Sequence, residues 1–172
     1  LLHLAGDLIL GWGVEDESLT GLFRMLSAYT ATSSSGILAS ALLGLLGMTL
    51  EGLSLFGVYR LMAEKFPKDT HRYRSGILGW LMFGACGFHV PTCALVFLAK
   101  HGLPAETLAQ FALYFLLPAT ALFWVFFLLL AGTQIAAFAR GHTPYPRWCW
   151  VFSPLVGDWR PRSWAFSATF RS

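Results

Sequence analysis

The chain has 172 residues, of which 56% are hydrophobic and 12% are charged, and its mean hydropathy is +0.59. Soluble domains carry roughly 25% charged residues, so this composition argues against a soluble domain and indicates an integral membrane protein. The length suits a single domain. The net charge of +3 comes from basic residues that cluster in particular loops, so it describes membrane topology and gives no support for nucleic-acid binding.

The first apolar segment, residues 1–12, is too short to cross a bilayer, because a spanning helix needs about 20 apolar residues. The chain opens at Leu1 with no initiator methionine. We therefore expect residues 1–12 to be the second half of a first span that starts before Leu1. A cleaved signal peptide is the alternative, but the segment lacks a basic leading region and a small-residue cleavage site.

Three later segments are long enough to cross, namely residues 36–62, 76–99 and 109–138. Before them, residues 17–30 place leucines at helical spacing and predict a helix along the outer membrane interface. A fifth apolar run, residues 148–157, is too short to cross.

The predicted fold class is therefore all-α, a polytopic transmembrane helix bundle of four spans of which the first is partial. Residues 1–157 are expected to form one transmembrane domain. Residues 158–172 begin with Asp158 and contain arginines, tryptophans and a proline. We expect this irregular tail not to cross the membrane.

Loop charges predict the orientation of these spans. The loop 13–35 is acidic, whereas the loops 63–75 and 139–147 are basic. Because cytoplasmic loops carry an excess of lysine and arginine, the two basic loops are placed inside. The prediction is a multi-pass protein of the cell membrane with its N-terminus in the cytoplasm.

Three ionisable residues lie well inside the apolar segments: Asp7, Glu51 and His89. Each charge costs at least about 2.5–3.5 kcal/mol in the hydrocarbon, so such residues are paired or functional. At about 1.5 Å of rise per residue, all three fall between the bilayer midplane and the outer leaflet. We expect Glu51 and His89 to lie in direct or one-water contact, with Asp7 on the same cavity.

Residue spacing predicts how the helices pack. One face of the second span is rich in small residues, which allow close approach of another helix. It carries Ser40, Gly44, Gly47, Glu51, Ser54 and Val58. In the third span, helical spacing places five residues on one face, Met82, Cys86, His89, Cys93 and Val96. Pro91 and Pro118 each remove a backbone hydrogen bond and are expected to kink their helices.

The candidate catalytic residues are Asp7, Glu51 and His89, which together can act as a general acid and base. The candidate ligand-binding residues are His3, Tyr59, Arg60 and Tyr114. His3 shares a helix face with Asp7, Tyr59 and Arg60 lie one or two turns further in, and Tyr114 lies next to Pro118.

Other interpretations of these residues stay open. Two histidines and two carboxylates can form a zinc-type site, but no spacing matches a metal signature, so no metal site is assigned and no cofactor is identified. Glu51 and His89 can instead bond each other or a backbone carbonyl and fix the bundle. Tyr59 and Arg60 can be interfacial anchors, and membrane cysteines usually pack as small hydrophobic residues.

Four sequence segments, LAGD, EGLSLFGVYRL, CGFHVPTCALVF and PYPRW, occur in this order. The chain resembles, over about residues 5–156, an uncharacterised family of bacterial polytopic membrane proteins known only as a domain of unknown function. The resemblance implies shared polar positions at Asp7, Glu51 and His89, and two more spans after Pro146. This chain departs from that pattern after Val156, so we expect it to be truncated at both ends. The resemblance implies architecture and no activity.

Three classes of function follow from the polar site. The first is a protein that binds or acts on a lipid-like or small apolar molecule, with Glu51 and His89 as acid and base. The second is a module that binds or transports an ion, a proton or a small ligand, and the third is a structural membrane subunit. The expected partners are membrane lipid and further copies of the chain in a homo-oligomer.

Overall fold

The computed structural model describes residues 2–10 and 14–153, and within these ranges the chain forms helices joined by short connections, with no strand. The all-α prediction is confirmed for this part of the chain. The predicted tail, residues 158–172, lies outside the described residues.

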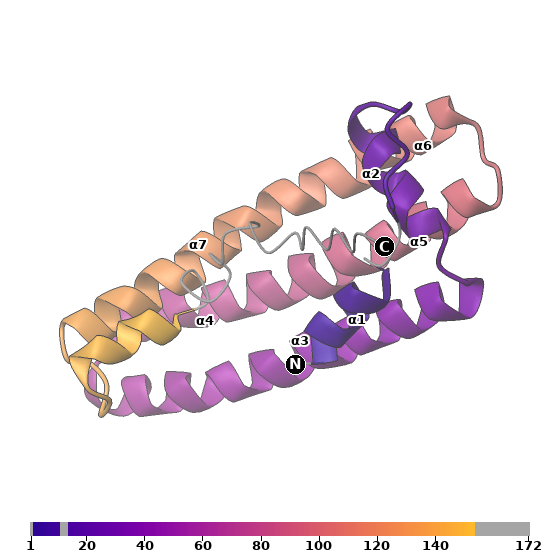
Figure 1. Ribbon diagram of the computed structural model, residues 1–172. Coiled ribbons are helices and arrows are strands. Elements are labelled where there is room, and N and C mark those ends of the chain that lie inside the picture. The colour runs from indigo at the N-terminus through magenta and orange to yellow at the C-terminus, as the bar shows by residue number, and fades with distance from the viewer. Residues whose placement is uncertain (1, 11–13, 154–172) are drawn as a thin grey trace.

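Three long helical rods run side by side and antiparallel (Figure 1). The first rod is α3 (Ser34–Lys65). The second consists of α4 (Pro67–Leu81), the π-helix η1 (Met82–His89) and α5 (Val90–Lys100). The third consists of α6 (Ala105–Phe111), the π-helix η2 (Ala112–Leu116) and α7 (Leu117–Ala139). The second rod lies in the middle, packed against both others.

The three rods contain apolar helices long enough to cross a membrane, Ser34–Glu64, Thr70–Lys100 and Ala105–Ala139. Each includes a predicted span and extends it by one to six residues at both ends. On α3, exposed leucines recur every three or four residues, at positions 38, 42, 46, 50 and 53. This periodicity places them on one face. A continuous apolar face of this kind suits contact with hydrocarbon, so the structure is compatible with a membrane protein.

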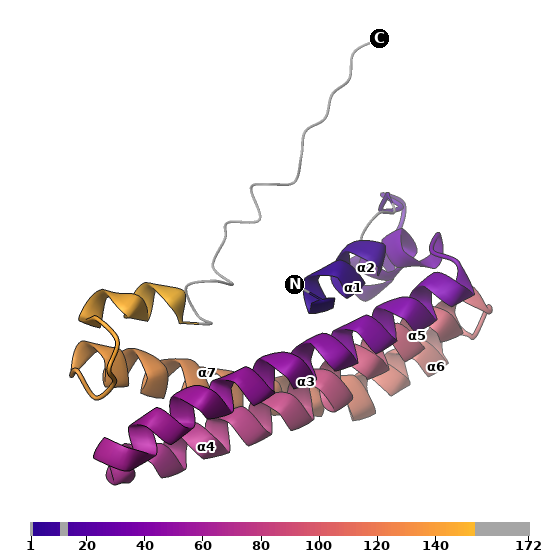
Figure 2. The ribbon, with the colours of Figure 1, turned by 90° about the horizontal axis from the view of Figure 1, so that it is seen from below.

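Three shorter helices complete the described fold: α1 (Leu2–Leu10), α2 (Gly21–Thr30) and the 3₁₀ helix η3 (Arg147–Phe152). The nine residues of α1 do not cross a bilayer, so a fourth span is not confirmed. Helix α1 packs on α3 and α2 packs on α5, and both lie on the same side of the rods (Figure 2). Helix α2 begins four residues later than the predicted interfacial helix, after a turn closed by Asp16 and Ser18.

The two basic loops lie at the same end of the bundle. The turn at Phe66 and the segment after α7 meet at the left of Figure 1, while α2 and the connection 101–104 lie at the opposite end. The rings of Phe66 and His142 stack with centroids 4.0 Å apart and join the two basic loops. This arrangement agrees with the alternation of loops in the sequence, whereas the side of the membrane on which each end lies is not fixed by the fold.

Each π-helix ends two residues before a proline: η1 before Pro91 and η2 before Pro118. Because proline has no N–H to donate to the preceding turn, the backbone there adopts the wider π spacing. A nearby threonine hydroxyl donates to a helix carbonyl in each case, Thr92 to Phe88 and Thr120 to Leu116, both at 2.7 Å. Such donors compensate for lost backbone bonds inside membranes.

The π-helix corrects one prediction about the third span. Met82 and Cys86 are exposed, whereas His89, Cys93 and Val96 are buried. The five residues were expected on one face because an α-helical period was assumed. The π spacing of η1 changes that period, so of the five residues only those from His89 onward share a buried face.

Glycines set the closest approach between the rods. A Cβ added at Gly76 of α4 lies 2.8 Å from the Cα and 2.9 Å from the N of Leu130 in α7. A Cβ added at Gly132, two residues further along α7, meets nothing within 4 Å. In lipid no hydrophobic force drives helices together, so their association depends on close packing. Small residues at the contacts allow the backbones to approach closely.

These two glycines provide a matched test of the packing. We expect Gly76→Ala to destabilise the bundle by about 1–3 kcal/mol, the cost of overpacking, because the methyl group meets backbone atoms. Gly132→Ala is expected to be neutral or stabilising by up to about 1 kcal/mol, since alanine favours the helix. Thermal unfolding of both variants in detergent measures the difference, and equal melting temperatures would contradict the close α4–α7 contact.

Candidate functional site

The candidate site surrounds His89, the last residue of η1, which is 9% exposed. Its Nδ1 lies 3.4 Å from Oδ1 of Asp7 in α1. Its Nε2 lies 3.1 Å from the backbone oxygen of Ser40 in α3. One imidazole therefore joins three helical elements that are distant in sequence, as predicted for Asp7 and His89.

Two glycines make room for this imidazole. A Cβ at Gly44 of α3 overlaps the His89 ring, lying 1.9 Å from Nε2. A Cβ at Gly6 of α1 lies 2.9 Å from the Ser40 oxygen and 3.2 Å from the Gly44 nitrogen. The backbones of α1 and α3 therefore cross closely, and the histidine ring fills the space that Gly44 leaves open.

The geometry determines where the histidine protons lie. A carbonyl oxygen only accepts hydrogen bonds, so Nε2 carries a hydrogen and donates it to Ser40. Nδ1 then faces the Asp7 carboxyl group with one proton to share between them. Either the imidazolium donates to the carboxylate, or the carboxylic acid donates to neutral histidine. Both forms leave the pair with no net charge, which suits an apolar environment.

Cys93, one turn after His89, connects this pair to an apolar groove. Its sulfur lies 3.9 Å from both the His89 Nε2 and the Ser40 hydroxyl. It also lines a groove of about 600 Å³ between α3 and α5, whose other walls include Leu38, Ala41 and Ala94. The groove is within the 300–1,000 Å³ range of small-molecule sites, and its walls are mostly apolar.

Access to the pair is from the side of α1. The Asp7 side chain is 57% exposed, whereas the His89 side chain is 11% exposed. A ligand can therefore reach the carboxyl group while the imidazole stays enclosed.

Glu51 is half-buried on α3, seven residues beyond Gly44. At 1.5 Å per residue this is about 10 Å along the helix axis. The hydrogen bonds and the ion pair seen for His89 go to Asp7, Ser40 and Cys93. A direct bond to Glu51 is not among them, and the predicted direct or one-water contact stays a prediction. The functional role of Glu51 stays a prediction.

Of the other predicted ligand residues, those whose side chains the structure describes are not gathered at this site. His3 lies in α1, and its side chain is outside the described residues. Tyr59 and Arg60 line a separate groove that also includes Arg74, and Tyr59 is about 22 Å from Gly44 along α3. Tyr114 is 68% exposed in η2. Their roles in ligand binding stay predictions.

Metal ligation is not suggested by the part of the chain that the structure describes, which holds no group of three histidine, cysteine or acidic side chains arranged for an ion. Cys86 is exposed, while His89 and Cys93 are buried. Both ring nitrogens of His89 already face other polar atoms. We assign no metal to the site.

Three contributors to the site were not identified as such from the sequence: Gly6, the Ser40 carbonyl and Gly44. The small-residue face of the second span contained Ser40 and Gly44, but it did not show that a histidine occupies the gap. Gly6 directly precedes Asp7, and this adjacency is the signal that could have indicated a close crossing of α1.

Comparison with curated proteins finds no significant match, and none of the solved structures matches. A family model does match, and it covers residues 1–158. It is described as a family of unknown function, in agreement with the resemblance found in the sequence. The chain belongs to this family of unknown function, DUF6796.

Proposed function

We propose that this is an integral membrane protein that binds a lipid-like or small apolar molecule at the Asp7–His89 pair. One observation supports this most directly: Cys93 borders both the pair and the apolar groove between α3 and α5. A molecule with a polar head and an apolar chain would place its head at Asp7 and its chain along the groove.

The head group would be a hydrogen-bond donor such as a hydroxyl or an amine, because an ionised carboxylate only accepts. Asp7 would accept this bond, and His89 would hold the carboxyl group in place. The pair also has the composition of a general acid and base. In an enzyme of this kind Asp7 and His89 would exchange a proton with the head group, with Glu51 further along α3.

A second candidate is a proton-binding module, favoured by the single proton that Asp7 and His89 share. Ionisable pairs within membranes commonly belong to proton relays. The two candidates differ in whether they need the apolar groove between α3 and α5. Lipid binding requires it, whereas a proton-binding pair does not. A variant that fills the groove therefore distinguishes them.

We also propose that the end of the bundle containing the basic loops 63–75 and 139–147 faces the cytoplasm, with the acidic loop 13–35 outside. The positive-inside rule supports this orientation. It places the Asp7–His89 pair in the outer half of the membrane of the cell, nearer to the end that carries α2 and α6.

Filling the groove tests lipid binding. Ala94 lines the groove, and Ala94→Phe is expected to reduce labelling by a photoactivatable diacylglycerol at least about tenfold, the effect of overpacking a site by about 1.4 kcal/mol or more. Ala121→Phe is the matched control, because Ala121 is exposed on α7. Labelling that is unchanged in Ala94→Phe would contradict the proposed lipid site.

Replacing Asp7 tests the Asp7–His89 pair itself, which both candidates require. Asp7→Asn keeps the shape of the side chain but alters the charge and the proton of the pair, so we expect loss of diacylglycerol labelling and of proton uptake by reconstituted vesicles. If the pair also binds a proton, Ala94→Phe should reduce lipid labelling and leave proton uptake unchanged, because it fills the groove without altering the pair. Normal labelling in Asp7→Asn would rule out Asp7 as the contact for the head group.

The orientation is tested by cysteine labelling in intact cells, in a background whose three native cysteines are replaced by alanine. Ser18, just before α2, and His71, near the start of α4, are both exposed. Helix α2 and the turn before α4 lie at opposite ends of the bundle (Figure 1). We expect a membrane-impermeant maleimide to label Ser18→Cys from outside and His71→Cys only after permeabilisation. The reverse pattern would overturn the orientation.

A further inference from the structure

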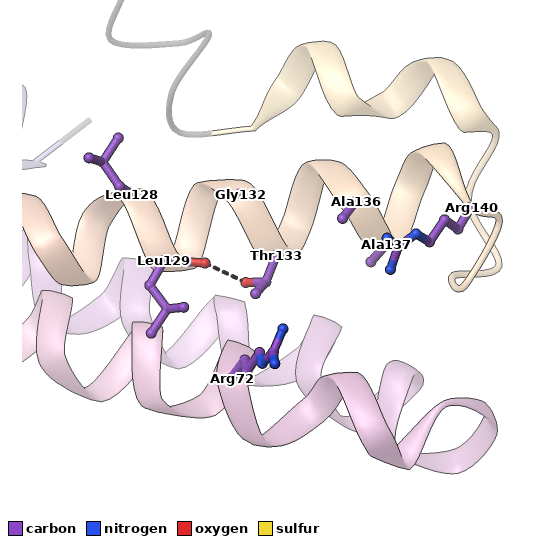
Figure 3. Close-up of a pocket in the computed structure, with 8 residues that line it drawn as sticks. All are labelled: Arg72, Leu128, Leu129, Gly132, Thr133, Ala136, Ala137 and Arg140. Carbon is purple, nitrogen blue, oxygen red and sulfur yellow. Dashed lines mark hydrogen bonds between the residues drawn. The ribbon is translucent and has the colours of Figure 1, made fainter.

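A second groove lies at the opposite end of the bundle from α2, between α4 and α7. It has a volume of about 280 Å³ and is lined by Arg72, Arg140, Leu128, Leu129, Gly132 and Thr133, among others. In Figure 3, Arg72 rises from α4 toward Thr133, and Arg140 turns back along α7 toward Ala137. Two guanidinium groups from different helices thus border one hollow.

Neither arginine forms an ion pair with an acidic side chain that the structure describes. The ion pairs seen among the described side chains are Arg24–Glu15 and His89–Asp7. Arginine binds phosphate oxygens with paired N–H donors. Two such groups beside one hollow are complementary to a phosphate.

The surface of α7 that continues from the groove suits an acyl chain. Leu128 lines the groove, and Leu128, Val125 and Leu122, which are 53%, 59% and 41% exposed, follow one face of α7 away from the arginines. From Gly132 to Leu122 the helix rises about 15 Å, which is about half of the 30 Å hydrocarbon thickness. A chain along this face would therefore reach the bilayer midplane.

We propose that this groove binds an anionic phospholipid, with its phosphate between Arg72 and Arg140 and an acyl chain along Leu128, Val125 and Leu122. Basic pockets between membrane helices recognise lipid head groups in this way. The site is separate from the Asp7–His89 pair, and it does not depend on the function proposed for that pair.

Native mass spectrometry of the purified full chain tests this site with dioleoyl phosphatidylglycerol and dioleoyl phosphatidylcholine as probes. We expect wild type to retain the anionic lipid in preference to the zwitterionic one. Arg72→Gln and Arg140→Gln should each lower retention of phosphatidylglycerol about fivefold, the change expected for one basic residue at an anionic surface. Arg24→Gln is the matched control, because Arg24 pairs with Glu15 in the outer segment, and it should retain the lipid normally.

A second variant addresses the groove itself. No atom lies within 4 Å of a Cβ added at Gly132, so Gly132→Leu should fold and fill the hollow, and we expect it to lose the lipid while both arginines stay in place. Equal retention of the two lipids by wild type, an equal loss in Arg24→Gln, or full retention in Gly132→Leu would each overturn the proposal. So would displacement of the lipid by millimolar inorganic phosphate, because that would indicate a simple anion site.

Discussion

The fold depends on the burial of one imidazole where three helical elements meet. His89 of η1 fills the gap above Gly44, donates to the Ser40 carbonyl and faces Asp7. A buried polar group without partners costs several kcal/mol in an apolar environment. The three elements must therefore stay together for His89 to keep its partners, and the lack of side chains at Gly6 and Gly44 makes that approach feasible.

This histidine also lies between the two apolar clusters of the bundle. One cluster contains Met62, Tyr73 and Leu130, and the other contains Leu26, Ile37 and Val96. The π-helix η1 ends at His89. Along the second rod, the buried face turns at this point from the first cluster toward the second. Because π segments often occur at functional sites, the irregularity that joins the two halves also places the polar pair beside the apolar groove. Stability and proposed function therefore depend on the same residues.

The sequence predicted the long helices well, because apolar length alone identifies a spanning segment. It also predicted that Asp7 and His89 meet, since their estimated depths agreed. The predicted direct or one-water contact of Glu51 with His89 stays a prediction, because depth is only one coordinate; it is Gly44 whose position on α3 faces the ring. The prediction that Met82 and Cys86 share one face with His89 was wrong, because an assumed α-helical period does not anticipate the π-helix η1. The glycine contacts could not be predicted, because they depend on how two helices lie relative to each other. The spacing of residues along one helix gives no information on that.

The pairing of Asp7 with His89 is tested most directly by a double-mutant cycle on the free energy of unfolding. Asp7→Asn, His89→Gln and the combined variant would be measured by reversible unfolding in lipid bicelles. We expect a coupling of about 1–3 kcal/mol, as for residues in one hydrogen-bonded network. Single effects that add to within about 0.5 kcal/mol, as found for independent sites, would contradict the central role of this pair.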